Sequence, residues 1–147
     1  LKSHYIYSAE AITGLTIRRL SRKAFESEVA NCAAIGPVVF SQMADEMAAA
    51  QDQMVLLSTK NAEERLCSFF LKGLQRTCRD GNVEPVVHLP MTRLDIADYL
   101  GLTIETVSRN MTRLRSMRVI DLPNRGSFVI KDLDRLRLLA QDEGKMH

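Results

Sequence analysis

The sequence lacks a long apolar run and a disulfide-like set of cysteines, and each absence excludes a class of protein. The longest stretch without a charged side chain runs from Val29 to Ala44 and is interrupted by Gly36 and Pro37. It is too short and too broken to cross a bilayer. The three cysteines are odd in number and widely spaced, which fits reduced thiols better than a disulfide framework. We therefore predict a cytoplasmic protein without a membrane segment.

Constellations typical of catalysis are also missing. The three histidines lie far apart, and none has a cysteine, histidine or carboxylate at metal-ligand spacing. The sequence contains no glycine-rich phosphate loop and no nucleophile elbow. We predict that the chain is not an enzyme and holds no metal or other cofactor. Because it begins at Leu1 without an initiator methionine or a secretory signal, we expect a fragment of a longer protein whose effector is unknown.

The composition that is present is that of an ordinary globular domain. The chain has 147 residues, 46% hydrophobic and 26% charged, which excludes disordered and collagen-like classes. The net charge of +2 hides an asymmetry, because residues 1–60 hold six basic and six acidic side chains, whereas residues 106–120 hold four arginines and no acid. A basic stripe is the electrostatic signature of phosphate binding, although solvated arginines on a helix would produce the same pattern.

The first 20 residues have the alternation of short β-strands. Tyr5-Ile6-Tyr7 forms one apolar run, and Ile12, Leu15 and Ile17 suggest a second strand. Two strands do not make a domain by themselves. We therefore expect residues 1–20 to be the end of a β-structure that lies mostly before Leu1.

Two helices are predicted next, the second of them long. Ser21 can cap a helix through Val29, and Pro37 suits the first turn of another that runs to about Lys60. Apolar residues recur along the second helix at intervals of three and four, as in a coiled coil. This apolar seam predicts that the helix pairs with its own copy in a homodimer, although it could instead pack on the missing β-domain or inside a monomeric bundle. The seam consists of Phe40, Met43, Met47, Ala50, Met54 and Leu57.

The following segment resembles a capped helix leading into a turn. Asn61 and Glu64 have capping-box spacing, and the helix should end near Cys78. Residues 79–85 are typical of a turn, and residues 86–89 are an apolar run that could form a short strand. The core face of the helix is predicted to comprise Leu66, Phe69, Phe70 and Leu74.

Beyond Pro90 the sequence predicts a winged helix-turn-helix. Thr92 and Thr103 begin two helices, and Ala97, Gly101 and Val107 have the spacing of this motif. A small residue allows the helices to cross closely, glycine supplies a left-handed turn, and the β-branched side chain fills the crossing. Two apolar runs, 119–122 and 127–130, flank the hairpin turn 123–126 and predict a β-wing. The predicted fold class is therefore mainly α with small β.

A recognition helix over residues 104–117 would place Glu105, Ser108 and Arg109 on one face, in the major groove. Arg109 can pair with guanine, Glu105 can accept from a cytosine amino group, and Ser108 can adapt or pack near a thymine methyl. Glu105 could instead only balance the helix dipole. Residues expected to contact DNA phosphates are Thr92, Arg93, Thr103, Thr106, Arg113, Arg115 and Arg125.

Two rival functions remain open at this stage. A winged helix can bind protein, and a basic one can bind DNA without sequence preference. The four arginines of residues 106–120 argue against the first rival. Glu105 argues against the second, because a carboxylate repels phosphate and weakens DNA binding unless it accepts a hydrogen bond from a base.

The run from Thr92 to Arg109, TRLDIADYLGLTIETVSR, resembles the DNA-binding motif of the Crp/FNR family of bacterial transcription regulators. Glu105, Ser108 and Arg109 match the Glu-x-x-Ser-Arg signature of its FNR and FixK branch, whereas cAMP-receptor-type members have arginine at the position of Ile104 and glycine in place of the serine. By this resemblance, residues 1–20 are the end of the N-terminal sensor β-roll. Residues 21–60 are a short helix plus the dimerisation helix, and residues 61–147 are the winged helix-turn-helix DNA-binding domain.

The resemblance also implies a function. The full protein would be a homodimer on a TTGAT-N4-ATCAA-like palindrome in double-stranded DNA. Arg109 would read the G, Glu105 the paired C or the next A·T pair, and Ser108 the outer T. Residues 80–86 would contact RNA polymerase, as in an activator. Ala50 and Gln51 stand where cAMP-responsive members present hydroxyls, so cAMP is not expected. Thr92 stands where some FixK relatives have a redox-active cysteine, so thiol switching there is not expected either.

Overall fold

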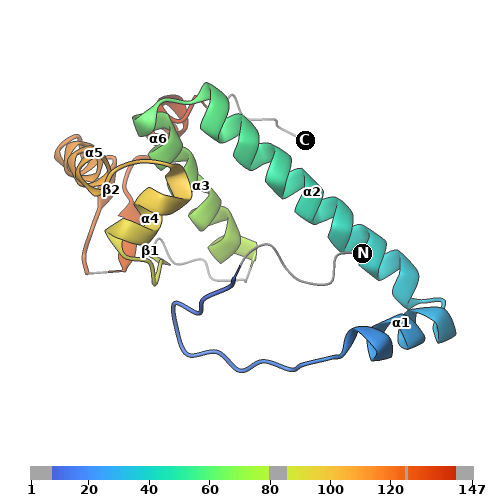
Figure 1. Cartoon of the computed structure of the whole chain (residues 1–147). Helices are drawn as coiled ribbons and strands as arrows, with labels where there is room; N and C mark the ends of the chain where they lie inside the picture. Colours follow the sequence, from blue (N-terminus) through green and yellow to red (C-terminus); the bar gives the residue numbers. More distant parts are fainter. Residues whose placement is uncertain (1–7, 80–85, 125, 142–147) are drawn as a thin grey trace. The chain divides into compact units, whose positions relative to one another are not determined.

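The computed structural model describes residues 8–79, 86–124 and 126–141 (Figure 1). The described residues fall into two compact units, divided between Asp52 and Gln53. In the first unit, α1 (Arg22–Asn31) begins as predicted, because the Ser21 hydroxyl accepts the Ala24 N–H at 3.2 Å. The long helix α2 (Ile35–Thr59) begins two residues before Pro37 and ends beyond the boundary of the unit. The last two turns of α2 therefore belong to the second unit.

The strand predicted around Ile12–Ile17 is wrong for the residues described. Residues 8–20 are irregular, and the side chains of Leu15 and Ile17 are mostly exposed. A strand forms only when a neighbour supplies hydrogen bonds to its backbone, and none of the described segments pairs with this one. The run Tyr5-Ile6-Tyr7 lies outside the described residues.

The second unit is organised around α3 (Ala62–Arg79). Its predicted capping box forms, because the Asn61 N–H donates to the Glu64 carboxylate at 2.9 Å and the Glu64 N–H donates to Asn61 Oδ1 at 3.1 Å. Leu66 and Phe70 are fully buried, and the Phe70 ring lies 4.5 Å from that of Phe128, centroid to centroid. Part of the core of this unit therefore lies between α3 and the sheet, and buried side chains of the other helices of this unit extend it.

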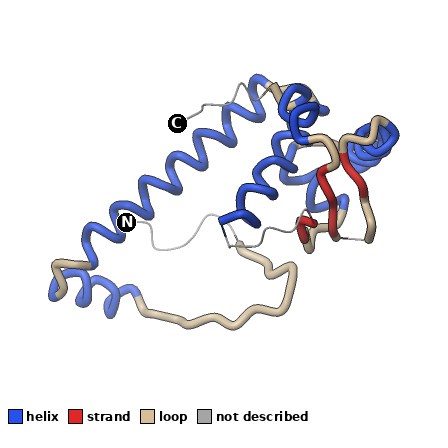
Figure 2. Tube along the Cα trace, turned by 180° about the vertical axis from the view of Figure 1, so that it is seen from behind, coloured by secondary structure: helices blue, strands red, loops and turns tan. Residues whose placement is uncertain are grey.

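Three of the described segments form an antiparallel sheet, in the order β1 (Val86–His88), β3 (Ser127–Ile130), β2 (Ile120–Asp121). The predicted wing is the hairpin of β2 and β3. The third strand is β1, which pairs Val87 with Phe128. The sheet is small beside the helices, which confirms a mainly α fold with little β-structure (Figure 2).

The remaining helices complete this unit. The two helices of the predicted motif are α4 (Arg93–Leu100) and α5 (Ile104–Ser116). A last helix, α6 (Leu133–Leu139), was not predicted; Asp132 caps it and its Leu136 is buried. Among the helices that the structure describes, none combines the length and the apolar character needed to cross a membrane.

Candidate nucleic-acid interface

The entrance to α4 is fixed by a complete capping box. The Thr92 hydroxyl accepts the Asp95 N–H at 3.2 Å, while one Asp95 carboxylate oxygen accepts the Thr92 hydroxyl at 2.7 Å and the Thr92 N–H at 2.6 Å. The hydrogen bonds from the Thr92 hydroxyl and backbone favour the ionised carboxylate and lower the pKa of Asp95. These bonds hold Thr92 and Arg93 in place at the N-terminus of the helix.

The turn between α4 and α5 has the geometry that the sequence predicts. Gly101 adopts φ 61° and ψ 44°, a left-handed conformation that favours glycine. The Leu102 N–H reaches the Ala97 carbonyl at 2.9 Å and closes the end of α4. Ala97 and Val107 are both buried. The three residues that define the motif therefore perform the predicted structural roles.

The helix α5 separates a buried face from a solvent-facing one. Its Thr103 hydroxyl accepts the Thr106 N–H at 3.2 Å, and the buried face consists of Val107, Asn110, Met111 and Leu114. Glu105 and Arg109 are exposed on the other face, and Ser108 between them is half-buried. The structure thus places the three predicted base-reading side chains on one accessible surface, which we call the reading face.

One contact across the motif was not predicted from the sequence. Arg93 Nη1 donates to the Ser108 hydroxyl oxygen at 3.2 Å, which connects the first residue of α4 to the reading face. The two residues are 15 positions apart, and neither a repeat nor a cap predicts that they meet. The bond places a cation beside a predicted base-reading residue.

Three of the predicted phosphate-contacting residues line one cleft. It has a volume of about 860 Å³, and its lining includes Thr92, Arg93 and Arg115 of the motif and Asn124 of the wing. None of the described residues that line it is acidic. Two guanidinium groups without an opposing carboxylate make this cleft attractive to an anion.

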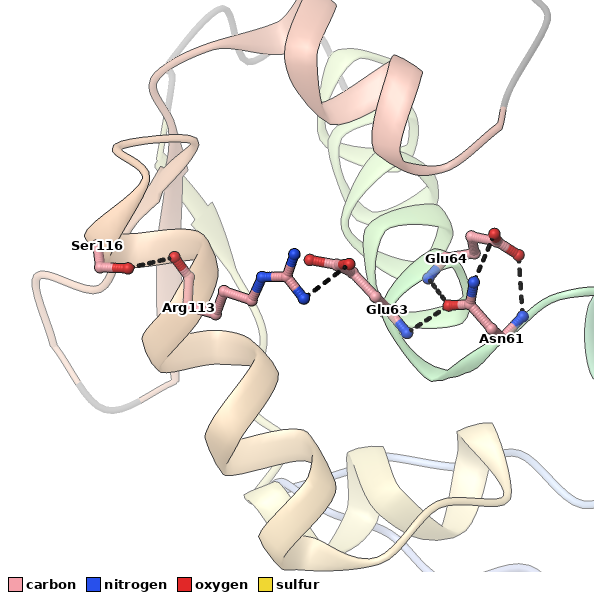
Figure 3. Close-up of polar contacts among 5 residues, drawn as sticks. All are labelled: Asn61, Glu63, Glu64, Arg113 and Ser116. Carbon is pink, nitrogen blue, oxygen red and sulfur yellow. Dashed lines mark hydrogen bonds and ion pairs between the residues drawn. The ribbon is translucent and has the colours of Figure 1, made fainter.

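Arg113 is engaged elsewhere. Its Nη1 lies 3.4 Å from a carboxylate oxygen of Glu63 in α3, so the side chain reaches across to the helix whose N-terminus Asn61 caps (Figure 3). The pair is largely exposed on the arginine side, so it contributes little to stability. The hydroxyls of Thr103 and Thr106 lie 3.0 Å from each other. Arg125 lies outside the described residues.

The apolar seam is uncovered along its described length. Its side chains range from 38% exposed for Leu57 to 75% for Phe40, and Ala50 is exposed as well. Seams of this kind are covered in a soluble protein by another apolar surface.

Within the second unit, the crossing of α4 and α5 followed by the β2-β3 hairpin defines a winged helix-turn-helix domain. Residues 64–139 match the Crp-like helix-turn-helix domain. The chain belongs to the Crp/FNR family, in its FixK-like branch.

Several relatives are similar along nearly all of this chain. The transcriptional activatory protein AadR of Rhodopseudomonas palustris is 40% identical, over 94% of this chain and 57% of its own length. The nitrogen fixation regulation protein FixK of Azorhizobium caulinodans is 36% identical, over 92% of this chain and 55% of its own. The chain thus spans somewhat more than half the length of these relatives. None of those named here is an enzyme, which agrees with the prediction from the sequence.

Solved structures agree with this assignment. FixK2 from Bradyrhizobium japonicum superposes with a TM-score of 0.74 and 32% identity, covering 82% of this chain and 59% of that one. A CooA mutant from Carboxydothermus hydrogenoformans gives a TM-score of 0.71 at 21% identity, over 80% of this chain and 54% of that one, which supports the fold alone.

Proposed function

We propose that the chain is the dimerising and DNA-binding part of a transcription regulator that binds a TTGAT-N4-ATCAA-like palindrome as a homodimer. The reading face carries this proposal, because it presents Glu105, Ser108 and Arg109 to solvent from a helix whose opposite side is anchored in the core. The names of the relatives, a transcriptional activatory protein and a nitrogen fixation regulation protein, point to the same kind of activity.

Each residue of the reading face has a distinct role in this proposal. Arg109 donates two hydrogen bonds to guanine, and Glu105 accepts one from the paired cytosine or contacts the next A·T pair. Ser108 contacts the outer T of the half-site. Because a carboxylate next to the DNA backbone costs binding energy unless it finds a base donor, Glu105 favours sequence reading over non-specific binding.

Phosphate contacts orient this face on the duplex. Thr92, Arg93 and Arg115 provide them from the cleft, and Arg113, Arg125 and the hydroxyls of Thr103 and Thr106 add to them. Arg113 has to exchange its Glu63 partner for a phosphate, which an exposed ion pair permits at small cost.

The apolar seam joins two copies of the chain. Phe40, Met43 and Met47 begin the contact, and Ala50, Met54 and Leu57 continue it toward the DNA-binding unit. Two copies then present two recognition helices to half-sites about one helical turn apart.

Substitution of Met47 by Asp tests this contact. It puts a carboxylate among the apolar side chains of the seam, and we expect the sedimentation mass to fall to that of one chain.

The same proposal includes a contact with RNA polymerase, as in an activator, by residues 80–86, most of which lie outside the described residues. It also places the protein in the cytoplasm, where its DNA is found. Membership of the Crp/FNR family supports both proposals.

Substitution of Arg109 by Ala tests the proposed function. Affinity for the palindrome should fall and the preference at the G·C pair should flatten, with a loss of about 1–3 kcal/mol of discrimination. Binding to a duplex of unrelated sequence should change little. An equal loss on every sequence would show that Arg109 is a phosphate contact, and no loss on any sequence would favour a winged helix that binds protein.

A further inference from the structure

The guanidinium of Arg65 donates to three backbone carbonyl groups at the ends of two different helices. Its Nε donates to the Lys60 carbonyl at 2.8 Å, and Nη2 donates to the Leu57 carbonyl at 2.8 Å. Its Nη1 donates to the Leu100 carbonyl at 3.1 Å. Leu57 lies in the last turn of α2, Lys60 directly follows that helix, and Leu100 is the last residue of α4.

These acceptors are groups that need a partner. The last carbonyls of a helix have no intrahelical donor and carry the negative end of the helix dipole. A planar guanidinium with five N–H donors can satisfy several of them at once, and its charge strengthens each bond. Arg65 therefore fastens the end of α2 to the end of α4.

Two further contacts join the same segments. Gln53 Nε2 in α2 donates to the Tyr99 carbonyl at 2.9 Å, one residue before the carbonyl that Arg65 holds. A Leu57 methyl lies within 3.7 Å of the space that a side chain at Gly101 would enter. The last two turns of α2 thus hold three consecutive residues, Tyr99, Leu100 and Gly101, where the recognition motif turns.

We infer that Arg65 is a positioning residue that fixes the recognition helix relative to the dimer contact and so selects the spacing between half-sites. The inference rests on the proposed function. Met54 and Leu57 of the apolar seam lie on the same two turns of α2 that Gln53 and Arg65 fasten to α4. Whatever holds those turns to α4 therefore also sets the distance from Met54 and Leu57 to the reading face.

The expected phenotype follows from the geometry of DNA. One added base pair moves a half-site by about 3.4 Å and rotates it by roughly 35°. A recognition helix that is fastened to the dimer contact cannot follow this change, whereas one that pivots freely can. Loss of Arg65 should relax the choice of spacer without altering the choice of bases, since the reading face itself is untouched.

The experiment compares the affinities of the chain and of Arg65→Ala for TTGAT/ATCAA palindromes with spacers of three, four and five base pairs. A fourth duplex has the N4 spacer and inverted G·C pairs. We expect the unsubstituted chain to prefer N4 by about tenfold or more, and Arg65→Ala to prefer it by less than about threefold. The preference for intact over inverted G·C pairs should be equal in both proteins.

Lys60→Ala is the matched control. The Lys60 Nζ donates to the Ser68 hydroxyl and to the Ala140 carbonyl, each at 2.8 Å, so it holds the end of α6 and not α4. It should lower the melting temperature and leave the spacer preference unchanged. Arg65→Lys replaces the planar guanidinium by a single ammonium group, so its preference for the N4 spacer should lie between those of the unsubstituted chain and Arg65→Ala.

Several results would overturn the inference. One is an unchanged spacer ratio in Arg65→Ala, and another is the same relaxation in Lys60→Ala. If Arg65→Ala does not fold, Gln53→Ala decides, because it removes only the bond to Tyr99 and should partly relax the ratio; an unchanged ratio there contradicts the inference. An unsubstituted chain that binds all spacers equally would contradict it directly. A chain that ignores the G·C inversion would overturn the proposed function instead.

Discussion

Arg93 and Ser108 are joined by a hydrogen bond of 3.2 Å that runs from the guanidinium of α4 to the hydroxyl oxygen of α5. The hydroxyl accepts in this bond, so its own hydrogen stays free to be donated to a base. The arginine is exposed and lines the cleft beside Thr92. One pair of side chains therefore connects the surface proposed to contact phosphate with the one proposed to contact bases.

This connection predicts that the two residues act together on DNA. Arg93→Ala should weaken binding to all duplexes and lower the salt slope by about 0.9 through the loss of one phosphate contact. Ser108→Ala should change the preference at the outer base pair and also release Arg93. In a double-substitution cycle on the palindrome, the combined loss should differ from the sum of the single losses by at least about 0.5 kcal/mol. Strict additivity would show that the bond has no role in binding.

Arg115 and Arg113 should differ in their contribution to phosphate binding. Arg115 lines the cleft, whose described lining residues carry no carboxylate, whereas Arg113 is paired with Glu63. Arg115→Ala should therefore lower the salt slope by about 0.9, and Arg113→Ala should lower it by less. Glu63→Gln is the control, because it frees Arg113 and should raise affinity on every sequence. A larger effect of Arg113→Ala than of Arg115→Ala would contradict this ranking.

Gly101 should be sensitive to substitution by residues that avoid left-handed backbone. Its φ of 61° costs a residue with a Cβ about 1–2 kcal/mol. Gly101→Ala should therefore lower the free energy of unfolding by that amount in urea. Gly101→Asn should cost less, because asparagine enters this region more readily. Equal losses for both substitutions would point to crowding at the turn as the cause.

Cys67 should be a protected thiol. Burial, together with the nearby carboxylates of Glu63 and Glu64, raises the pKa of Cys67 from 9.0 to about 12, and the Lys60 ammonium opposes only part of this shift. Because the folded state holds this proton more tightly, its contribution to stability is complete below pH 9 and is lost as the pH rises toward 12. At pH 8, mass spectrometry after alkylation should find exposed Cys32 modified and Cys67 unmodified. In urea both should react, and equal labelling of the two in buffer would contradict this account.

The caps and turns of the motif could be predicted because they depend on residues close in sequence. Thr92 with Asp95, Asn61 with Glu64, and Gly101 at the turn are all local signals. The contacts of Arg93, Arg65 and Arg113 could not be predicted, because each joins helices that meet only after the chain has folded. The alternation around Ile12–Ile17 wrongly predicted a strand for the same reason, because a strand depends on hydrogen bonds from a partner that is distant in sequence. The pairing of β1 with β3 was missed as another long-range contact.

The most direct test of the proposed function is a titration of this chain with a labelled duplex containing TTGAT-N4-ATCAA and with one whose G·C pairs are inverted, at about 150 mM salt. The account predicts that the intact palindrome binds more tightly by at least about tenfold, since each half-site loses one arginine-guanine contact in the inverted duplex. Equal, weak and salt-sensitive binding to both duplexes would contradict it.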